Sequence, residues 1–335
     1  MKRLLLAAAA CAAVATSGPA HAWGGAGHRM QGQAAMRGLP DEVPAFLRTR
    51  QAALDVGELV REPDRSKGAG KLHDHDRDSA HFIDIDNEGR LLGGPPWLPL
   101  SATRADYETK LRLAGLDQWK AGYLPYSILD RYQQLVVDLA YWRVLDAAER
   151  NPKWEADRKW FRQDRLRREA LILKGIGELG HFVGDGSQPL HLSVHYNGWG
   201  DYPNPAGYST ARLHGPFEGD LVRDRVRPAD VETRMAPFRS CACPIEQRVV
   251  DYLTVGWKQV IPFYELEKAG GLRADDPRGP EFAAVRLAAG ASELRDLIVE
   301  AWRDSVKSKV GWKPVTVEDV LAGKVDPYPS LYAVD

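Results

Sequence analysis

The sequence predicts an all-α protein that folds as a single mainly helical domain, and three observations support this. Several stretches repeat apolar residues at intervals of three and four, the period of a helix with one buried face. Strand signals are scarce, and no internal repeat or low-complexity linker divides the chain. The composition, 44% hydrophobic and 27% charged over 335 residues, is ordinary for a soluble globular protein and excludes disorder, collagen and coiled coil.

The first 22 residues have the pattern of an export signal. Lys2 and Arg3 precede an apolar run over 4–14, and Ala20-His21-Ala22 fits a small-x-small cleavage site. The run is too short to span a bilayer, and no later stretch reaches the roughly 18 to 20 uninterrupted apolar residues that spanning needs. We therefore expect an exported protein, periplasmic or secreted, without a transmembrane segment.

Cleavage at this site makes 23–335 the mature domain, with Trp23 as its first residue. Cys11 would suit a lipoprotein, but the apolar segment before it has only seven residues, and the downstream Ala-x-Ala site is better formed. Lipidation is therefore the weaker interpretation.

The helical period is clearest in four stretches, at 127–149, 166–183, 245–266 and 282–302. Each has enough apolar positions on one face to pack against a neighbouring helix. Because proline lacks the backbone N–H that a helix interior needs, we expect the third stretch to kink or break at Pro262.

Two segments are expected to be non-helical. The best strand signal is Phe82 to Ile85, followed by turn residues and two leucines, which predicts one small hairpin near residues 82–92. Residues 195–214 hold one tryptophan and three tyrosines among Gly, Asn and Pro. Such a loop is too polar for a core and commonly lines a binding surface, although a plain surface loop is the alternative.

Charge and cysteine content exclude two classes of protein. The net charge of −1 gives no field that would draw the whole chain onto nucleic acid or acidic membranes, so any such contact depends on a local patch. In the mature chain only Cys241 and Cys243 remain, too few for a disulfide-framed scaffold. We expect them to have a local structural role. Such a pair can close a small disulfide in an oxidising compartment, and the sequence leaves open whether the two are bonded.

The histidines have spacings that suit metal ligands. Residues four apart in a helix lie on one face, so His181 and Asp185 can bind the same ion, and so can His214 and Glu218 if their segment is helical. His191 lies between the two pairs. Imidazole and carboxylate without thiolate favour zinc, in a catalytic rather than a structural site. The alternative for any single histidine is a local capping role.

The motifs that carry this chemistry are Trp23-Gly-Gly-Ala-Gly-His28, His81-Phe-Ile-Asp84, Gly180-His181-Phe-Val-Gly-Asp185-Gly-Ser-Gln-Pro-Leu-His191 and Leu213-His214-x-x-x-Glu218. Together they resemble the superfamily of zinc-dependent phospholipases C and single-strand-specific nucleases. The resemblance runs from Trp23 to about Glu218 and implies an all-helical fold with three zinc ions in one cleft.

The resemblance also implies a ligand set. One zinc would be held by Asp64, His81, His181 and Asp185, a second by His191, His214 and Glu218, and a third by the amine and carbonyl of Trp23 with His28, while Asp185 bridges the first and third. Because the Trp23 amine becomes a ligand only after signal removal, export and activation would be coupled.

Some assignments leave alternatives open. Asp64 lies in a segment that resembles the family only loosely, so Asp55 or Glu58 could replace it, and a turn aspartate after proline is the structural alternative. The segment 73–76 (His-Asp-His-Asp) is expected to be a solvated loop, because alternating residues cannot all face one ion. His195 is expected at the edge of the cleft.

Clustered zinc ions would generate hydroxide for attack on phosphorus, which predicts a phosphodiesterase with Asp64 as a catalytic residue. In a nuclease, Phe82 would stack on a base, Asp84 would accept hydrogen bonds from its edge, and Lys67 would also bind substrate. Phe82 as a core residue and Asp84 as a turn acid are the structural alternatives.

Two substrates remain open. The intervals between motifs favour a nuclease for single-stranded DNA or RNA, whereas Glu218, at a place where nucleases usually have Asp, resembles the phospholipase C branch. The aromatic loop would also suit an enzyme that works at a lipid surface. A zinc-storing protein would saturate its metals with protein ligands, which this pattern does not do. No obligate protein partner is indicated.

Overall fold

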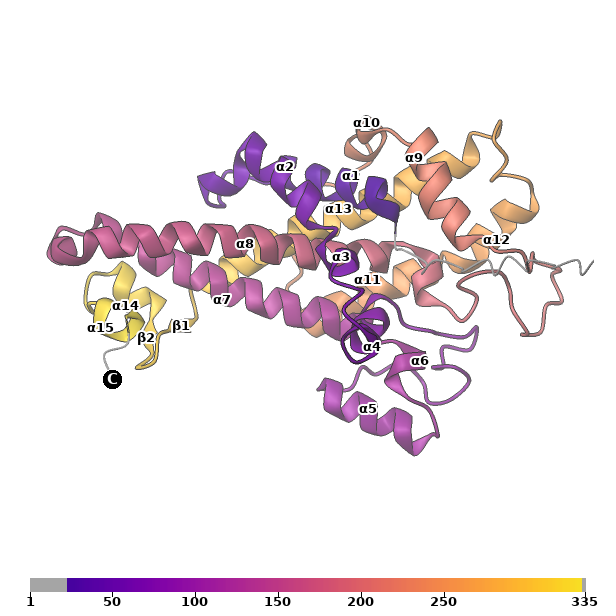
Figure 1. The fold of residues 1–335 in the computed structure, drawn as a ribbon, viewed down its shortest axis with the longest axis horizontal. Coiled ribbons are helices and arrows are strands. Elements are labelled where there is room, and N and C mark those ends of the chain that lie inside the picture. Colours follow the sequence, from indigo (N-terminus) through magenta and orange to yellow (C-terminus); the bar gives the residue numbers. More distant parts are fainter. Residues whose placement is uncertain (1–22, 333–335) are drawn as a thin grey trace, which may run out of the picture.

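The computed structural model describes residues 23–332; the predicted export signal, with Cys11, lies outside the described residues. Two long helices, α7 (Leu124–Arg150) and α8 (Arg158–Ser187), lie side by side along the length of the molecule (Figure 1). A third, α13 (Arg278–Ser305), packs against both, and α1 (Gly24–Arg37) and α2 (Arg50–Leu59) pack against α8. This arrangement confirms the prediction of a mainly helical, all-α fold.

Shorter elements surround these helices. They are η1 (Ala45–Arg48), α3 (Glu62–Arg65), α4 (Lys71–Asp78), η2 (Ser79–His81), α5 (Arg104–Leu113), α6 (Gln118–Ala121), η3 (Pro152–Asp157), η4 (Pro189–Leu192), η5 (Pro216–Leu221), α9 (Val222–Arg225), α10 (Pro228–Glu232), α11 (Ile245–Trp257), α12 (Val260–Lys268), α14 (Val317–Leu321) and α15 (Tyr328–Leu331). The strands β1 (Lys309–Val310) and β2 (Val315–Thr316) pair antiparallel.

The predicted helix at 245–266 is two helices, and the break lies before the expected proline. Helix α11 ends at Trp257 and α12 begins at Val260, so Pro262 occupies the first turn of α12. The first turn of a helix has N–H groups without intrahelical partners, so proline costs nothing there. Pro262 therefore favours a helix start just upstream rather than a kink at its own position.

The predicted hairpin near 82–92 is reduced to a single bridge between Ile85 and Leu91. Ile83 pairs instead with Gly122, and the Ile83 N–H donates to the His191 carbonyl (2.9 Å). This segment is therefore tied to distant parts of the chain at its start, while Asp86 bonds to Arg90 and Leu92 bonds to Asp84 across its own turn. Among residues 23–332, the regular two-stranded hairpin is the one formed by β1 and β2.

Two further features concern the cysteines and the composition of the helices. A disulfide joins Cys241 to Cys243 in the loop before α11, which answers a question that the sequence left open. Within residues 23–332, no helix combines the length and apolar composition that crossing a bilayer requires.

Glycines let α8 approach its neighbours closely. A Cβ added at Gly177 would lie 2.6 Å from the Leu59 Cβ and 2.7 Å from the Leu59 backbone carbon, at the end of α2. At Gly180, it would meet Leu294 of α13 at 2.8 Å. These distances are shorter than any normal contact. The close crossing of α8 over α2 and α13 is therefore possible because Gly177 and Gly180 have no side chains.

We expect Gly177→Ala to destabilise the protein and Gly175→Ala to stabilise it. Both changes gain helix propensity of about 0.5 to 1 kcal/mol. At Gly175 the nearest atom to an added Cβ is Asp138 Oδ2 at 3.9 Å, whereas at Gly177 the backbone of Leu59 must move. Thermal unfolding of both variants measures the difference, and equal melting temperatures would disprove the close crossing of α2 and α8.

Candidate metal centre

The last turns of α8 present His181 and Asp185 to the interior. Both side chains are fully buried, and their spacing of four residues places them on one helix face, as the sequence predicts. Helix α1 lies directly against this turn, since a Cβ at Gly184 would be 2.9 Å from His28 Cε1. The His28 ring therefore stacks on His181, with centroids 4.2 Å apart.

Donors from other elements hold the C-terminal end of α8. The Tyr252 hydroxyl donates to the Val183 carbonyl (2.6 Å), and Arg286 Nε donates to the Ser187 carbonyl (2.9 Å). The indole of Trp23 donates to Ser187 Oγ (2.8 Å). Carbonyls at a helix end have no intrahelical partner, so these bonds both satisfy them and fix the turn that carries Asp185. They also place Trp23, fully buried, beside the site.

Asp185 faces three imidazole rings. Its Oδ1 lies 3.4 Å from His28 Nε2, and its Oδ2 lies 3.5 Å from His181 Nε2 and 3.6 Å from His81 Nδ1. These separations are too long for good hydrogen bonds. Two ligands of one tetrahedral zinc, each about 2.0 to 2.2 Å from it, are roughly 3.3 to 3.6 Å apart. One carboxylate oxygen thus points to His28, and the other points to His81 and His181.

Asp64 completes one of these groups. Its Oδ1 lies 3.9 Å from His81 Nε2 and 4.0 Å from His181 Nε2. The structure thus brings Asp64, rather than Asp55 or Glu58, to the histidines. Glu58 instead forms ion pairs with Arg29 and Arg61 at the surface, and Asp55 accepts a bond from Gln51.

Lys67 lies at the edge of this group. Its Nζ is 3.3 Å from both Asp64 Oδ1 and Asp78 Oδ1, and the side chain is largely buried. The lysine is therefore a fixed positive charge beside the candidate ligands, held by two carboxylates.

Backbone carbonyls orient two of the histidines. His181 Nδ1 donates to the Val60 carbonyl just after α2, and His191 Nδ1 donates to the His81 carbonyl, both at 2.8 Å. Each bond fixes the tautomer in which Nε2 carries the lone pair, provided that the ring is neutral. Metal-binding histidines are characteristically held in this way through the ring nitrogen that does not bind the metal.

His191, His214 and Glu218 form a separate group. His214 Nε2 lies 2.8 Å from Glu218 Oε2 and 3.0 Å from His191 Nε2, while His191 Nε2 is 3.7 Å from the same carboxylate oxygen. Gln188 Nε2 also donates to Glu218 Oε2 (3.3 Å). His214 Nε2 is within hydrogen-bond distance of both Glu218 and His191, so a metal here would displace a proton.

The helical segment that places Glu218 is unusual. It begins at His214 and widens into the π-helix η5, in which Pro216 is the first residue. A π-turn is rare and is found mostly at functional sites. The sequence predicts the pairing of His214 with Glu218 but contains no signal for the π-turn.

These groups meet the requirements of metal ions. Three sets of side chains converge: His28, His181 and Asp185; Asp64, His81 and His181; and His191, His214 and Glu218. Within the described residues, both oxygens of Asp185, both ring nitrogens of His81 and Nε2 of His181 are buried without a hydrogen-bond partner. Buried polar atoms are normally paired, so cations are the natural partners for these lone pairs. Nitrogen and oxygen donors without thiolate fit zinc.

Burial changes the protonation of the first two groups. Burial lowers the pKa of His181 to about 4, although the Asp185 carboxylate opposes this shift. Burial, together with the charge of His181, holds the pKa of His81 well below its usual range. Burial also raises the pKa of Asp185 to about 6. The two histidines are therefore neutral at pH 7, which is the form that binds a metal.

In the third group, the Glu218 carboxylate, together with Asp185, outweighs the effect of burial on the pKa of His191. Burial lowers the pKa of His191, but its hydrogen bond with Glu218 and the nearby carboxylates outweigh this and raise the pKa to about 9. Burial raises the pKa of Glu218, and the charges of His214 and His191 reverse this and lower it. Glu218 is thus ionised and ready to act as a ligand.

The predicted substrate residues lie beside the metal groups. Residues 82–86 are extended, with Ile83 and Ile85 in the core and the two predicted residues on the other face. Phe82 is half-buried, and its ring rests on Gly122, where a Cβ would be 2.6 Å from Phe82 Cδ2. Asp84 is buried near His191, and burial raises its pKa well above the usual range despite that histidine.

The aromatic loop differs from the expectation. Trp199 is only 3% exposed, its ring is stacked on His195 at 3.7 Å, and its indole donates to the Pro203 carbonyl. The loop therefore contributes Trp199 to the core, and Tyr196 and Tyr202 remain exposed. The indole finds a backbone acceptor within the loop, which makes its burial tolerable.

Two other histidine assignments are corrected. His195 is fully buried rather than at a cleft edge, because its Nδ1 donates to the Trp199 carbonyl and its own carbonyl accepts from the Tyr264 hydroxyl. Residues 73–76 belong to helix α4 rather than to a loop, although none of the residues of that helix is buried. His75 stacks on Trp119 there.

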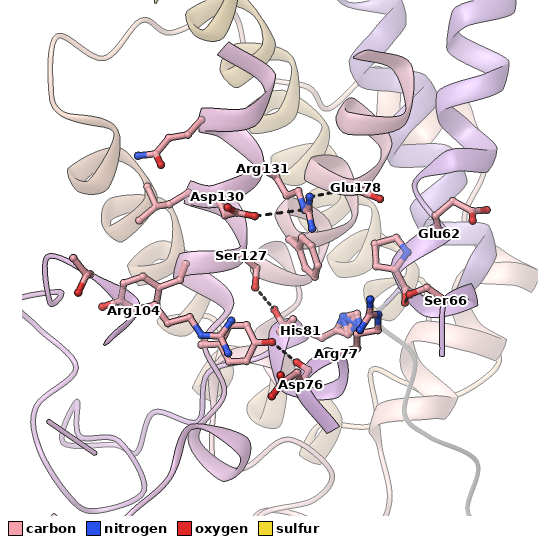
Figure 2. A pocket seen from close by; sticks show the side chains of 18 of the residues that line it. Glu62, Ser66, Asp76, Arg77, His81, Arg104, Ser127, Asp130, Arg131 and Glu178 are labelled. Atoms are coloured by element: carbon pink, nitrogen blue, oxygen red, sulfur yellow. Dashed lines mark hydrogen bonds and ion pairs between the residues drawn. The ribbon is translucent and has the colours of Figure 1, made fainter. Parts of the chain in front are cut away.

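A cleft opens next to the first metal groups. It has a volume of about 760 Å³ and is lined by His81 and Phe182 together with residues of α3, α4, α5, α7 and α8. Figure 2 shows Arg77 and Arg104 on either side of His81, and Arg131 across the cleft between Asp130 and Glu178. Phe82 and Asp84 do not line this cleft. The sequence contains no signal for this cleft, because the residues that line it do not have the spacing of metal ligands.

Comparisons with protein-family models, with curated proteins and with solved structures give no match to this chain. The fold and the site alone therefore define it as a mainly helical protein with buried His/Asp/Glu groups that could hold metal ions.

We expect His214→Gln to lower the bound metal content and His195→Gln to leave it unchanged. Both rings are buried, but His214 belongs to a group of convergent ligands and His195 does not. Elemental analysis of each purified variant after dialysis measures the difference. Equal metal loss in the two variants would mean that the structure groups the wrong histidines.

Proposed function

We propose that this protein is an exported phosphodiesterase with three zinc ions, and that its substrate is single-stranded DNA or RNA. The position of Asp185 is the observation that carries this proposal, since its Oδ1 faces His28 and its Oδ2 faces His81 and His181. A carboxylate shared in this way favours a cluster of ions over isolated ions. The buried lone pairs that surround it favour metals over a network of hydrogen bonds.

Each zinc would have a ligand set from this chain. Asp64, His81, His181 and Asp185 would hold one, His191, His214 and Glu218 a second, and Trp23 with His28 and Asp185 a third. When bound, zinc ions supply Lewis acidity that activates water and stabilises charge on phosphorus oxygens.

The chain's own residues would orient the substrate. Lys67 provides a positive charge beside Asp64, where it could pair with a phosphate oxygen. Phe82 is half-buried and directly follows the candidate ligand His81, and Asp84 lies on the same face of its segment. A base stacked on Phe82 could donate hydrogen bonds to the Asp84 carboxyl.

The choice of nucleic acid over phospholipid rests on the aromatic loop. A loop that docks on a lipid surface needs exposed Trp and Tyr side chains at the headgroups. Trp199 is buried and tied to His195, so only Tyr196 and Tyr202 of that aromatic set remain well exposed among the described residues. Glu218 is the feature that favours a phospholipase C, and this activity is the second candidate.

One assay tests the proposal directly. The purified mature protein is incubated in parallel with single-stranded DNA, RNA and phosphatidylcholine, with and without a chelator. Cleavage of nucleic acid that the chelator abolishes is the expected result. Hydrolysis of phosphatidylcholine with nucleic acid untouched would establish the second candidate, and no hydrolysis of any phosphodiester would refute both.

Elemental analysis of the mature protein should find close to three zinc ions per chain. One extra residue before Trp23 should lower the count to about two, because the Trp23 amine is then no longer free. The same residue added after Asp335 is the matched control. If the extended protein keeps its full zinc content, the amine is not a ligand.

Phe82→Ala should raise KM for single-stranded DNA by about fivefold to a hundredfold, since stacking contributes about 1 to 3 kcal/mol per base. Asp84→Ala should act in the same direction, and zinc content should be unchanged in both. Phe238→Ala, which removes a surface ring beneath Arg303, is the control. An unchanged KM in the Phe82 and Asp84 variants would remove these two residues from the substrate site.

A further inference from the structure

The cleft beside His81, with a volume of about 760 Å³, has no role so far. It is built from segments distant in sequence, which α7 and α8 bring together. His81 belongs both to the metal groups and to the cleft wall. Phe182 stacks against His81, with centroids 5.4 Å apart, and lines the same wall. A molecule bound at the metal groups could therefore extend into this cleft.

Three guanidinium groups from three helices face the cleft: Arg77 from α4, Arg104 from α5 and Arg131 from α7. Arg77 is exposed and donates to the His73 carbonyl of its own helix (3.2 Å), and within residues 23–332 no carboxylate forms an ion pair with it. Arg104 lies 3.6 Å from the centroid of the Tyr123 ring. Guanidinium planes and aromatic faces are the surfaces on which unstacked bases settle.

Carboxylates also line the cleft, but protein donors engage several of them. Glu178 pairs with Arg131 (3.2 Å). Asp76 accepts from the Trp119 indole (2.8 Å). Glu62 pairs with Arg65 (2.7 Å). Arg65 and Arg131 offset the charges of Glu62 and Glu178, and Arg104 pairs with Glu108 (3.0 Å). Arg77 is the guanidinium of the three without a carboxylate partner among the described residues, so it is the group at this rim that can accept an anion.

We propose that this cleft, defined by Arg77, Arg104, Arg131 and Phe182, binds the nucleotides that flank the scissile phosphodiester of a single strand. The identification of the ligand as a nucleic acid rests on the proposed function. The cleft is large enough for more than a single small group, and its mixture of guanidinium, hydroxyl and aromatic groups suits phosphates and bases together. Binding there would make the protein prefer long strands to dinucleotides.

The test compares strand lengths. KM is measured for a dinucleotide and for a twelve-nucleotide single strand, with the wild type and with the double variant Arg77→Ala/Arg104→Gln. We expect the ratio of KM for the long strand to KM for the dinucleotide to rise about tenfold in the double variant. The slope of log KM against log salt for the long strand should fall by about 0.7 for each lost phosphate contact.

Arg167→Ala is the matched control, because it removes a similar charge at an exposed position of α8 outside the cleft. A second measurement separates this proposal from the proposed activity: fluorescence anisotropy of a labelled, cleavage-resistant phosphorothioate strand. Weaker binding of this strand by the double variant, with Arg167→Ala unchanged, supports the cleft whether or not the protein cleaves nucleic acid.

Two results would overturn the proposal. If the wild type cleaves single strands and the double variant keeps both the KM ratio and the salt slope, the cleft is not used although the nuclease activity stands. If the wild type neither binds the phosphorothioate strand nor cleaves nucleic acid, but hydrolyses phosphatidylcholine, the cleft proposal and the proposed nuclease activity both fall.

Discussion

The structure depends on the position of one buried carboxylate. Asp185 is fully buried and faces three imidazole rings without a hydrogen-bond partner among the described residues. Such a group is costly to bury, so the rest of the fold must hold it in place. The end of α8 is fixed by Tyr252 and Arg286, and α1 approaches it closely because position 184 is glycine. Cations between the carboxylate and the rings would offset the cost of burying them together.

The part of the site that the sequence predicts is the part set by local geometry. His181 with Asp185, and His214 with Glu218, are pairs that any helical turn would bring together. Asp64 could not be separated from Glu58 in this way, because both lie near the end of α2 and only tertiary contacts decide between them. Two arginines hold Glu58 at the surface, while the short helix α3 turns Asp64 towards His81.

The errors of the sequence interpretation have a common physical origin. Trp199 was expected at a surface because its neighbours are polar, yet its indole finds an acceptor within the same loop and its ring covers His195. The segment after His81 has a strand-like pattern, but the N–H groups of Ile83 and Asp84 bond to His191 and Ala121, and only from the Asp84 carbonyl onward does the segment pair across its own turn. In both places long-range contacts satisfied polar groups that local pattern alone could not assign.

His81 connects the metal groups with the open cleft, and this has a consequence for specificity. Its ring faces Asp64 and Asp185, its carbonyl orients His191, and its other neighbours form the cleft wall. The ligands must keep nearly fixed positions, since small displacements would break the convergence of buried lone pairs. Arg77 and Arg104 are under no such constraint, because they line the cleft beside His81 without belonging to any of the ligand groups. Selection of the substrate would therefore reside in residues that carry no metal-binding motif, while the motif itself would fix only the chemistry.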